Sequence, residues 1–88
     1  MEDNKLDFKI GRLHRLEADG ALKAFADLIV NDALLIKGLR VIEGKNGIFV
    51  SMPKQQGKDK KWYDTIHPVT RETEDEISSV ILRAFQEQ

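Results

Sequence analysis

Apolar and polar residues alternate near the start of the chain and predict a β-strand there. Leu6, Phe8 and Ile10 alternate with charged residues, which is the period of two expected when one face of a strand is buried. The next apolar residue, Leu13, is out of phase with this alternation. We therefore expect a bulge or bend near Gly11.

The pair Asp19-Gly20 predicts a hairpin, because Asp-Gly readily adopts the positive φ angles that tight hairpin turns require. The next segment, residues 21–30, is ambiguous. Its alternating apolar residues fit one strand face, whereas its alanine content also fits a short helix. The hairpin signal before it and Asn31-Asp32 after it favour a strand.

A third strand is expected over residues 33–42, with apolar residues on both faces. Such a pattern indicates a central strand, or one covered by a second subunit. The alternation predicts two sets of residues on opposite faces: Leu35, Leu39 and Val41, and Leu34, Ile36 and Ile42.

A turn at residues 44–47, with Asn-Gly chemistry, leads to a short fourth strand over residues 48–52, which Pro53 ends because it has no N–H to donate. Residues 54–61 contain no apolar side chain and predict a solvated loop, disordered when nothing is bound. Trp62 then begins the return of the chain, as a brief edge strand.

The last segment predicts an amphipathic helix, because its apolar residues recur at the spacing of one helix face. These residues are Ile77, Val80, Ile81, Ala84 and Phe85. Thr73 and Glu76 have the spacing of a capping box that begins the helix. Together the elements predict an α+β fold: a small antiparallel β-sheet of four to five strands with a C-terminal α-helix packed on it. We expect a single domain over residues 1–88.

The composition fits this interpretation. Among 88 residues, 41% are hydrophobic and 33% charged, which is typical of a globular protein with a small core. There is no cysteine, so disulfides and thiolate sites are excluded and a reducing cytoplasm is expected. The start of the chain, residues 1–5, is polar and acidic, and no window approaches the about 20 apolar residues of a membrane span. We expect neither export nor a membrane partner.

Charge is distributed unevenly, although the net charge is only −1. Residues 54–63 hold four lysines and one aspartate, a local charge of +3, whereas residues 74–88 have a local charge of −3. One end of the molecule is therefore suited to attract phosphate and the other to repel it.

The sequence offers little support for catalysis or for a cofactor. His14 and His67 lie far apart without further metal-ligand spacing, and the Gly-Lys pair at residues 44–45 lacks the spacing of a phosphate-binding loop. His67 follows Asp64 by three residues, so a hydrogen-bonded pair is conceivable, but a structural role before Pro68 is the better interpretation. We expect no enzyme, no cofactor, no metal and no small-molecule substrate.

The basic segment is the best candidate site. Its lysines suit phosphate contacts, and Trp62 or Tyr63 offers a surface on which a base could stack. The alternative for Trp62 and Tyr63 is a core or dimer contact, and for Trp62 this alternative is the favoured one. Arginines from the predicted strands would widen this basic patch if their side chains lie on strand faces that point the same way. The lysines are Lys54, Lys58, Lys60 and Lys61, and the arginines are Arg12, Arg15 and Arg40.

Several segments together resemble the stage V sporulation protein G (SpoVG) family of small bacterial regulators. They are Asp19-Gly20 with Leu22-Lys23-Ala24, residues 36–42, residues 44–49, Val50-Ser51-Met52-Pro53, and Asp64-Thr65-Ile66-His67-Pro68. The resemblance implies a homodimer that binds DNA, and in several members RNA, to regulate septation, sporulation, virulence or cell-surface genes. It also implies that the basic positions after Met52-Pro53 contact the nucleic acid.

This chain departs from the family pattern in two places. Gln55 and Gln56 stand where an arginine or lysine is common, and Trp62-Tyr63 replaces a typical Phe-Arg. Arginine reads guanine edges through a bidentate contact worth about 1–3 kcal/mol of discrimination. We therefore expect weaker or less selective binding, with two loops of a dimer presenting up to eight lysines to phosphates.

Two hypotheses remain open from the sequence. The first is a nucleic-acid-binding dimeric regulator with its site at Lys54, Lys58, Lys60, Lys61, Trp62, Tyr63 and Arg40. The second is a protein-interaction module in cell-division or developmental control, in which the same loop and aromatic residues contact another protein.

Overall fold

The computed structural model describes residues 6–17 and 19–87, which form six strands followed by one helix. The strands are β1 (Phe8–Arg15), β2 (Leu22–Val30), β3 (Leu34–Gly44), β4 (Gly47–Ser51), β5 (Lys54–Gln56) and β6 (Trp62–Asp64), and the helix is α1 (Arg71–Glu87). No helix in this described part of the chain is long and apolar enough to cross a bilayer.

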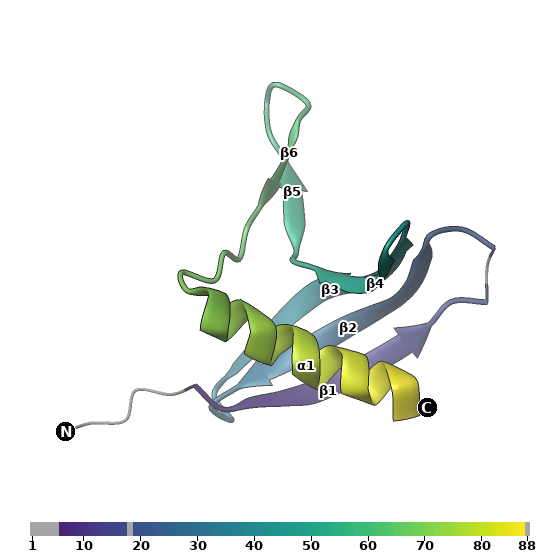
Figure 1. Ribbon diagram of the computed structural model, residues 1–88. Coiled ribbons are helices and arrows are strands. Elements are labelled where there is room, and N and C mark those ends of the chain that lie inside the picture. Colours follow the sequence, from purple (N-terminus) through teal and green to yellow (C-terminus); the bar gives the residue numbers. More distant parts are fainter. Residues whose placement is uncertain (1–5, 18, 88) are drawn as a thin grey trace.

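The first four strands form an antiparallel sheet in the order β1-β2-β3-β4, and α1 lies across one face of it (Figure 1). Strands β5 and β6 pair only with each other and project away from this body. The α+β fold and the helix packed on the sheet are confirmed. The four-stranded main sheet agrees with the expected strand number, and the two-stranded ribbon is separate from it.

The core lies between α1 and the two central strands. Its buried residues include Ala24, Ala26, Leu28, Val30, Leu39, Val41, Ile77 and Ile81. The segment that was ambiguous between strand and helix is therefore a strand, and its alternate residues face α1. Its alanines are explained by this position, because small side chains leave room for the helix to approach the sheet.

Three register shifts adjust the pairing of β2 with its two neighbours, one of them between Leu22 and Ala24. The register between β1 and β2 shifts between Ile10 and Arg12, which confirms the bulge predicted at Gly11. A second shift places both Lys37 and Gly38 opposite one residue of β2, and Gly38 has a φ of +89°. This positive φ suits glycine because it has no Cβ.

The bulge at Lys37-Gly38 reverses part of the face assignment predicted for β3. Ile36 packs on the core together with Leu39, because the inserted residue brings both side chains to the helix-covered face. Leu35 lies on the opposite face, where it and Ile29 both approach Gly11. The prediction that Leu35 shares a face with Leu39 and Val41 is therefore wrong.

The turns follow the predictions in part. The turn at residues 44–47 is confirmed, with Gly47 at a φ of +120°. The hairpin between β1 and β2 is also present, and the Leu16 N–H donates to the Lys23 carbonyl at 2.9 Å. Gly20, however, does not have a positive φ, so the expected tight Asp-Gly turn is wrong. Ala18, in the same connection, lies outside the described residues.

The helix begins three residues earlier than the capping-box spacing suggested. The Thr70 hydroxyl oxygen accepts a hydrogen bond from the Thr73 N–H at 3.1 Å, so Thr70 is the N-cap. Thr73 lies inside the first turn, and its predicted role as the cap is wrong. The predicted apolar stripe is confirmed, since Ile77 and Ile81 are fully buried beneath the helix.

Candidate nucleic-acid interface

The basic segment is a β-hairpin that projects from the body, and we call residues 54–64 the arm (Figure 1). Its strands pair through Lys54 with Asp64, Gln55 with Tyr63, and Gln56 with Trp62. The prediction of a disordered loop is therefore wrong. The brief strand expected at Trp62 is present, but it pairs within the arm and not with the main sheet.

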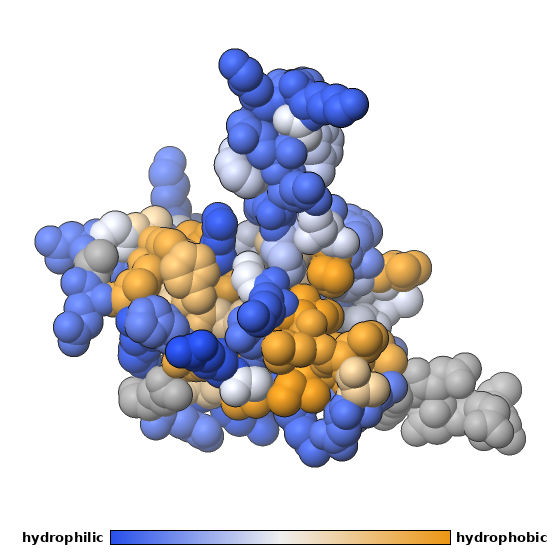
Figure 2. All heavy atoms as spheres, turned by 180° about the vertical axis from the view of Figure 1, so that it is seen from behind, coloured by the Kyte–Doolittle hydropathy of each residue, from blue (hydrophilic) through white to orange (hydrophobic). Residues whose placement is uncertain are grey.

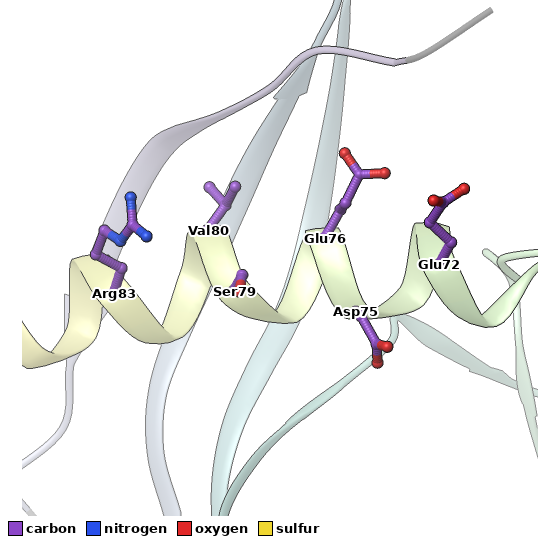
Figure 3. Close-up of a pocket in the computed structure, with 6 residues that line it drawn as sticks. All are labelled: Glu72, Asp75, Glu76, Ser79, Val80 and Arg83. Carbon is purple, nitrogen blue, oxygen red and sulfur yellow. The ribbon is translucent and has the colours of Figure 1, made fainter.

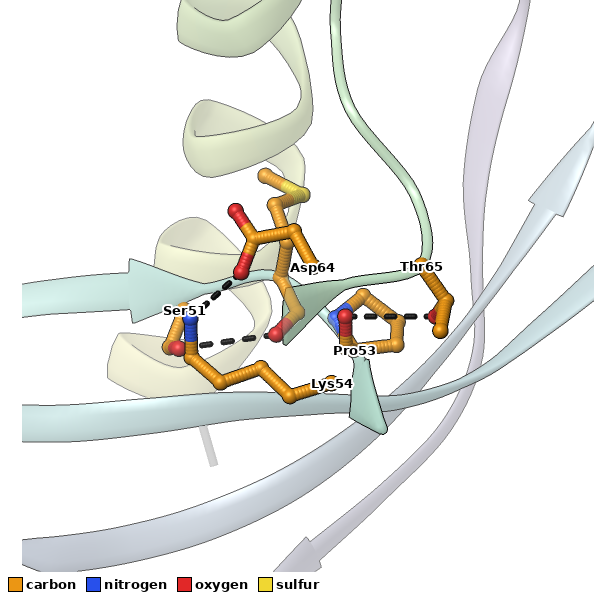
Figure 4. A network of polar contacts seen from close by, with 6 residues as sticks. Ser51, Pro53, Lys54, Asp64 and Thr65 are labelled. Atoms are coloured by element: carbon orange, nitrogen blue, oxygen red, sulfur yellow. Dashed lines mark hydrogen bonds and ion pairs between the residues drawn. The ribbon is translucent and has the colours of Figure 1, made fainter. Parts of the chain in front are cut away.

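The base of the arm is fixed by polar contacts around a buried proline (Figure 4). Lys54 forms an ion pair with Asp64 across the two strands. Next to it, the backbone N–H and the hydroxyl of Thr65 both donate to the Pro53 carbonyl, at 2.9 and 3.2 Å. Pro53 is buried and ends the main sheet, because it has no N–H to extend the ladder. The chain thus leaves the body at a defined point.

The tip of the arm is organised by Asp59. Its carboxylate accepts hydrogen bonds from the Lys61 N–H at 3.0 Å and from the Tyr63 hydroxyl. The bond from Tyr63 is the main reason that the pKa of Asp59 is lowered, and the same bond raises the pKa of Tyr63. The Tyr63 ring also packs on Gly57, where an added Cβ would lie 2.9 Å from the ring. The tip is therefore an ordered turn.

The four predicted lysines occupy two different environments. Lys54 lies at the base and is neutralised by Asp64, whereas the other three lie at the exposed tip. In the described part of the chain, Lys58, Lys60 and Lys61 form no ion pair. The arm holds four lysines against two aspartates, a formal charge of +2. The cations available to a ligand are therefore those of the tip.

The two aromatic residues also differ. Trp62 is 60% exposed and Tyr63 50% exposed, and as strand neighbours they lie on opposite faces of the ribbon. Burial in the core, one of the interpretations open for Trp62, is therefore wrong. Tyr63 is held by Asp59 and Gly57, so its role is to shape the tip. Trp62 is the better stacking surface.

Arg40 belongs to the sheet and not to the arm. It lies on the face opposite α1, with its guanidinium 5.8 Å from the centre of the Phe25 ring. Arg12 is on the same face, while Arg15 points to the helix side and lies over the Phe85 ring at 4.0 Å. Of the three predicted arginines, two therefore share a face.

The weaker candidates for chemistry do not converge. Asp64 is paired with Lys54, and in the described residues no hydrogen bond joins it to His67. The described residues also contain no group of three or more His, Cys, Asp or Glu side chains placed to hold a metal. A shallow depression along α1 is lined by residues of that helix alone, including Glu72 and Glu76 (Figure 3). Its acidic residues form the acidic side of the molecule.

A helix-covered four-stranded sheet with a projecting basic arm defines a class of small α+β proteins. The SpoVG family profile matches residues 7–87, and the chain belongs to this family. Among its relatives, the SpoVG protein of Archaeoglobus fulgidus, whose name links it to septation, is 40% identical over 77 residues, covering 88% of this chain and 91% of that protein.

Two bacterial relatives with the same kind of name are more distant. A second SpoVG protein of Listeria monocytogenes is 36% identical over 75 residues, covering 85% of this chain and 74% of its own. A SpoVG protein of Staphylococcus aureus is 34% identical over 76 residues, covering 86% and 76%. The match in each case spans most of both chains.

Proposed function

We propose that this protein is a non-catalytic regulator that binds nucleic acid, either DNA or RNA, through the arm. The observation that carries the proposal is the arm's tip, where three lysines without ion-pair partners in the described chain surround an ordered turn. Such lysines bind phosphates and release counterions, which gives affinity with little base selectivity. Trp62 adds a surface for stacking where bases are unpaired.

The distribution of charge supports this orientation of the molecule. The helix α1 carries five acidic side chains against two arginines, and Glu72 and Glu76 follow one side of it (Figure 3). A polyanion is repelled there and attracted to the arm. The names of the relatives suggest septation as the process that is regulated. This function also requires a cytoplasmic location.

Replacement of the tip lysines tests the proposal. The variant K58A/K60A/K61A is compared with K9A/K23A/K45A, which removes the same charge elsewhere on the surface. Binding of labelled duplex DNA and single-stranded RNA is followed by fluorescence anisotropy at several salt concentrations. The slope of log affinity against log salt falls by about 0.7–0.9 for each phosphate that is no longer neutralised. We expect this fall only in the tip variant, and equal slopes in the two variants would contradict the proposal.

We also propose that the protein acts as a homodimer, as expected from the resemblance. β1 and β4 are the edges of the sheet, and apolar side chains that include Leu34 and Val69 are exposed at one end of the molecule. Both features favour burial against a second copy. A 10.1 kDa species in sedimentation at micromolar concentration would contradict the dimer.

The alternative is a protein-interaction module without nucleic-acid binding. The same exposed apolar end and the net charge of −1 favour it. A partner bound by apolar contact would show little dependence on salt, so the salt series separates the two functions.

A further inference from the structure

The face of the main sheet opposite α1 is uncovered in the described chain, and its side chains form four rows across the strands. The rows are Lys9, Ile29 and Leu35; Arg12 and Asp27; His14, Phe25, Arg40 and Ser51; and Ile42 and Phe49. Figure 2 views the molecule from this side and shows apolar side chains gathered toward both ends, with hydrophilic ones between them. The two middle rows are therefore polar, aromatic and cationic.

A shallow pocket lies in these middle rows. It is lined by Arg12, His14, Phe25, Asp27, Lys37 and Gly38. The pocket exists because the bulge at Gly38 places a residue without a side chain beside Asp27. The Phe25 ring is 36% exposed beside this opening.

The charges around the pocket favour an anion. Arg12, Lys37 and Arg40 face a single carboxylate, that of Asp27, which gives a local formal charge of +2. No ion pair within the described residues involves any of these four groups. An aromatic ring next to cations that form no ion pair is the combination with which proteins bind single-stranded nucleic acid, since unpaired bases stack and phosphates pair with the cations.

The pocket lies close to the base of the arm. Arg40 pairs in register with Ser51, which comes just before the buried Met52-Pro53. Gly38 lines the pocket, and a Cβ at this position would lie 3.8 Å from the Pro53 Cβ. A strand bound along the arm can therefore continue onto this face of the sheet without crossing the acidic helix, which lies on the other side.

We propose that this pocket binds one nucleotide of a single strand whose neighbouring phosphates contact the arm. The base stacks on Phe25, Arg12 and Lys37 contact the phosphate, and the Asp27 carboxylate accepts a hydrogen bond from an amino group of the base. This inference rests on the proposed function and adds to it a preference for single strands over duplexes.

A second copy of the chain fits this face less well. Covering it in a dimer would desolvate Arg12, Lys37 and Arg40 together with one aspartate, and buried charges without matched partners are strongly unfavourable. A nucleotide instead supplies both an anion for these cations and a flat ring that stacks on Phe25.

The test compares two matched double variants. R12A/F25L removes one cation and one ring from the pocket, and K9A/F49L removes the same groups from the outer rows of the same face. Binding of single-stranded RNA, single-stranded DNA and the corresponding duplex is followed by anisotropy. For R12A/F25L we expect about a tenfold loss of affinity for the single strands and less than about a twofold change for the duplex. For K9A/F49L we expect no change in either.

The outcomes separate this inference from the proposed function. If R12A/F25L binds single strands as well as the native chain does, while K58A/K60A/K61A no longer binds, the inference of a nucleotide pocket is overturned. The proposed binding through the arm is then supported. If R12A/F25L instead changes only the oligomeric state measured by sedimentation, a second copy covers this face and the inference is overturned. No binding by the native chain overturns both. The variant D27N, which keeps the shape of the pocket, should change the preference among bases and leave the thermal midpoint unchanged.

Discussion

The body and the arm of this molecule are held by different kinds of interaction. In the body, Ile77 and Ile81 of α1 are buried in one core with residues of β2 and β3, so that apolar burial supplies the stability. In the arm, all six strand residues are exposed, and order comes from the Lys54–Asp64 ion pair and from the hydrogen bonds of Asp59. Changes to the arm should therefore alter binding while the body stays folded.

The largest effect on the body is expected from Ile81→Ala, because this side chain is fully buried. Removing it leaves a cavity, and the free energy of unfolding should fall by about 2–5 kcal/mol. Urea denaturation followed by circular dichroism measures the change. Gln86→Ala is the control, since Gln86 is exposed on the same helix and should change stability by less than about 0.5 kcal/mol. A decrease below about 1 kcal/mol at Ile81 would contradict the described core.

The corresponding change in the arm is Gly57→Ala. The added Cβ would lie 2.9 Å from the Tyr63 ring and 3.0 Å from an Asp59 oxygen, so the tip must rearrange. We expect faster amide hydrogen exchange at residue 57 and at Lys60, and weaker nucleic-acid binding, with the urea midpoint of the body unchanged. Gly20→Ala is the matched control, because no atom lies within 4 Å of a Cβ there. A large decrease of global stability in Gly57→Ala would show that the arm and body are not independent.

A smaller effect is expected at the start of α1, where the body meets the connection from the arm. Thr70→Ala removes the N-cap and should lower the free energy of unfolding by about 1 kcal/mol. Thr73→Ala should cost less, because its backbone N–H is the capped group and its hydroxyl only adds a bond to Thr70. If urea denaturation shows a larger loss of stability for Thr73→Ala than for Thr70→Ala, Thr73 is the cap, as predicted from the sequence.

The smallest effect concerns the titration of the arm. Asp59 raises the pKa of Tyr63 above the ordinary value of 10.0, so Asp59→Asn should lower it toward that value. In the native chain the Tyr63–Asp59 hydrogen bond should be complete between pH 3.8 and pH 10.0 and should break as the pH rises through the raised pKa of Tyr63. It should also weaken in acid, as the pH falls through the lowered pKa of Asp59, below 3.8. Tyr63 is the one tyrosine of the chain, so its phenolate absorbance reports this site alone.

The accuracy of the sequence predictions follows the same division. The helix stripe and the strand alternation are local patterns of the body, and they identified the apolar residues of α1 and the bulge at Gly11. The face of Leu35 was missed because the bulge at Gly38 shifts the register, and its position depends on pairing with β2. The sequence signal for that bulge was the lone glycine within a strand pattern.

The arm was predicted less well as a structure than as a site. Its lysines and aromatic residues were found from composition, but it lacks the apolar alternation by which strands are recognised. Its hairpin depends on hydrogen bonds from Lys61 and Tyr63 to Asp59, which no local pattern identified. The pocket beside Phe25 was missed because its residues come from three strands and meet only through the register.

The buried Pro53, where the chain leaves the sheet, has a consequence for how such proteins diverge. The hydrogen bonds from Thr65 to the Pro53 carbonyl hold together the two points where the chain leaves and re-enters the body. Substitutions between these two residues therefore do not alter the packing of the core. Natural selection can therefore change the arm and preserve the body separately. We expect relatives to differ in their targets chiefly through residues 54–64, while the proline and threonine that bracket them persist.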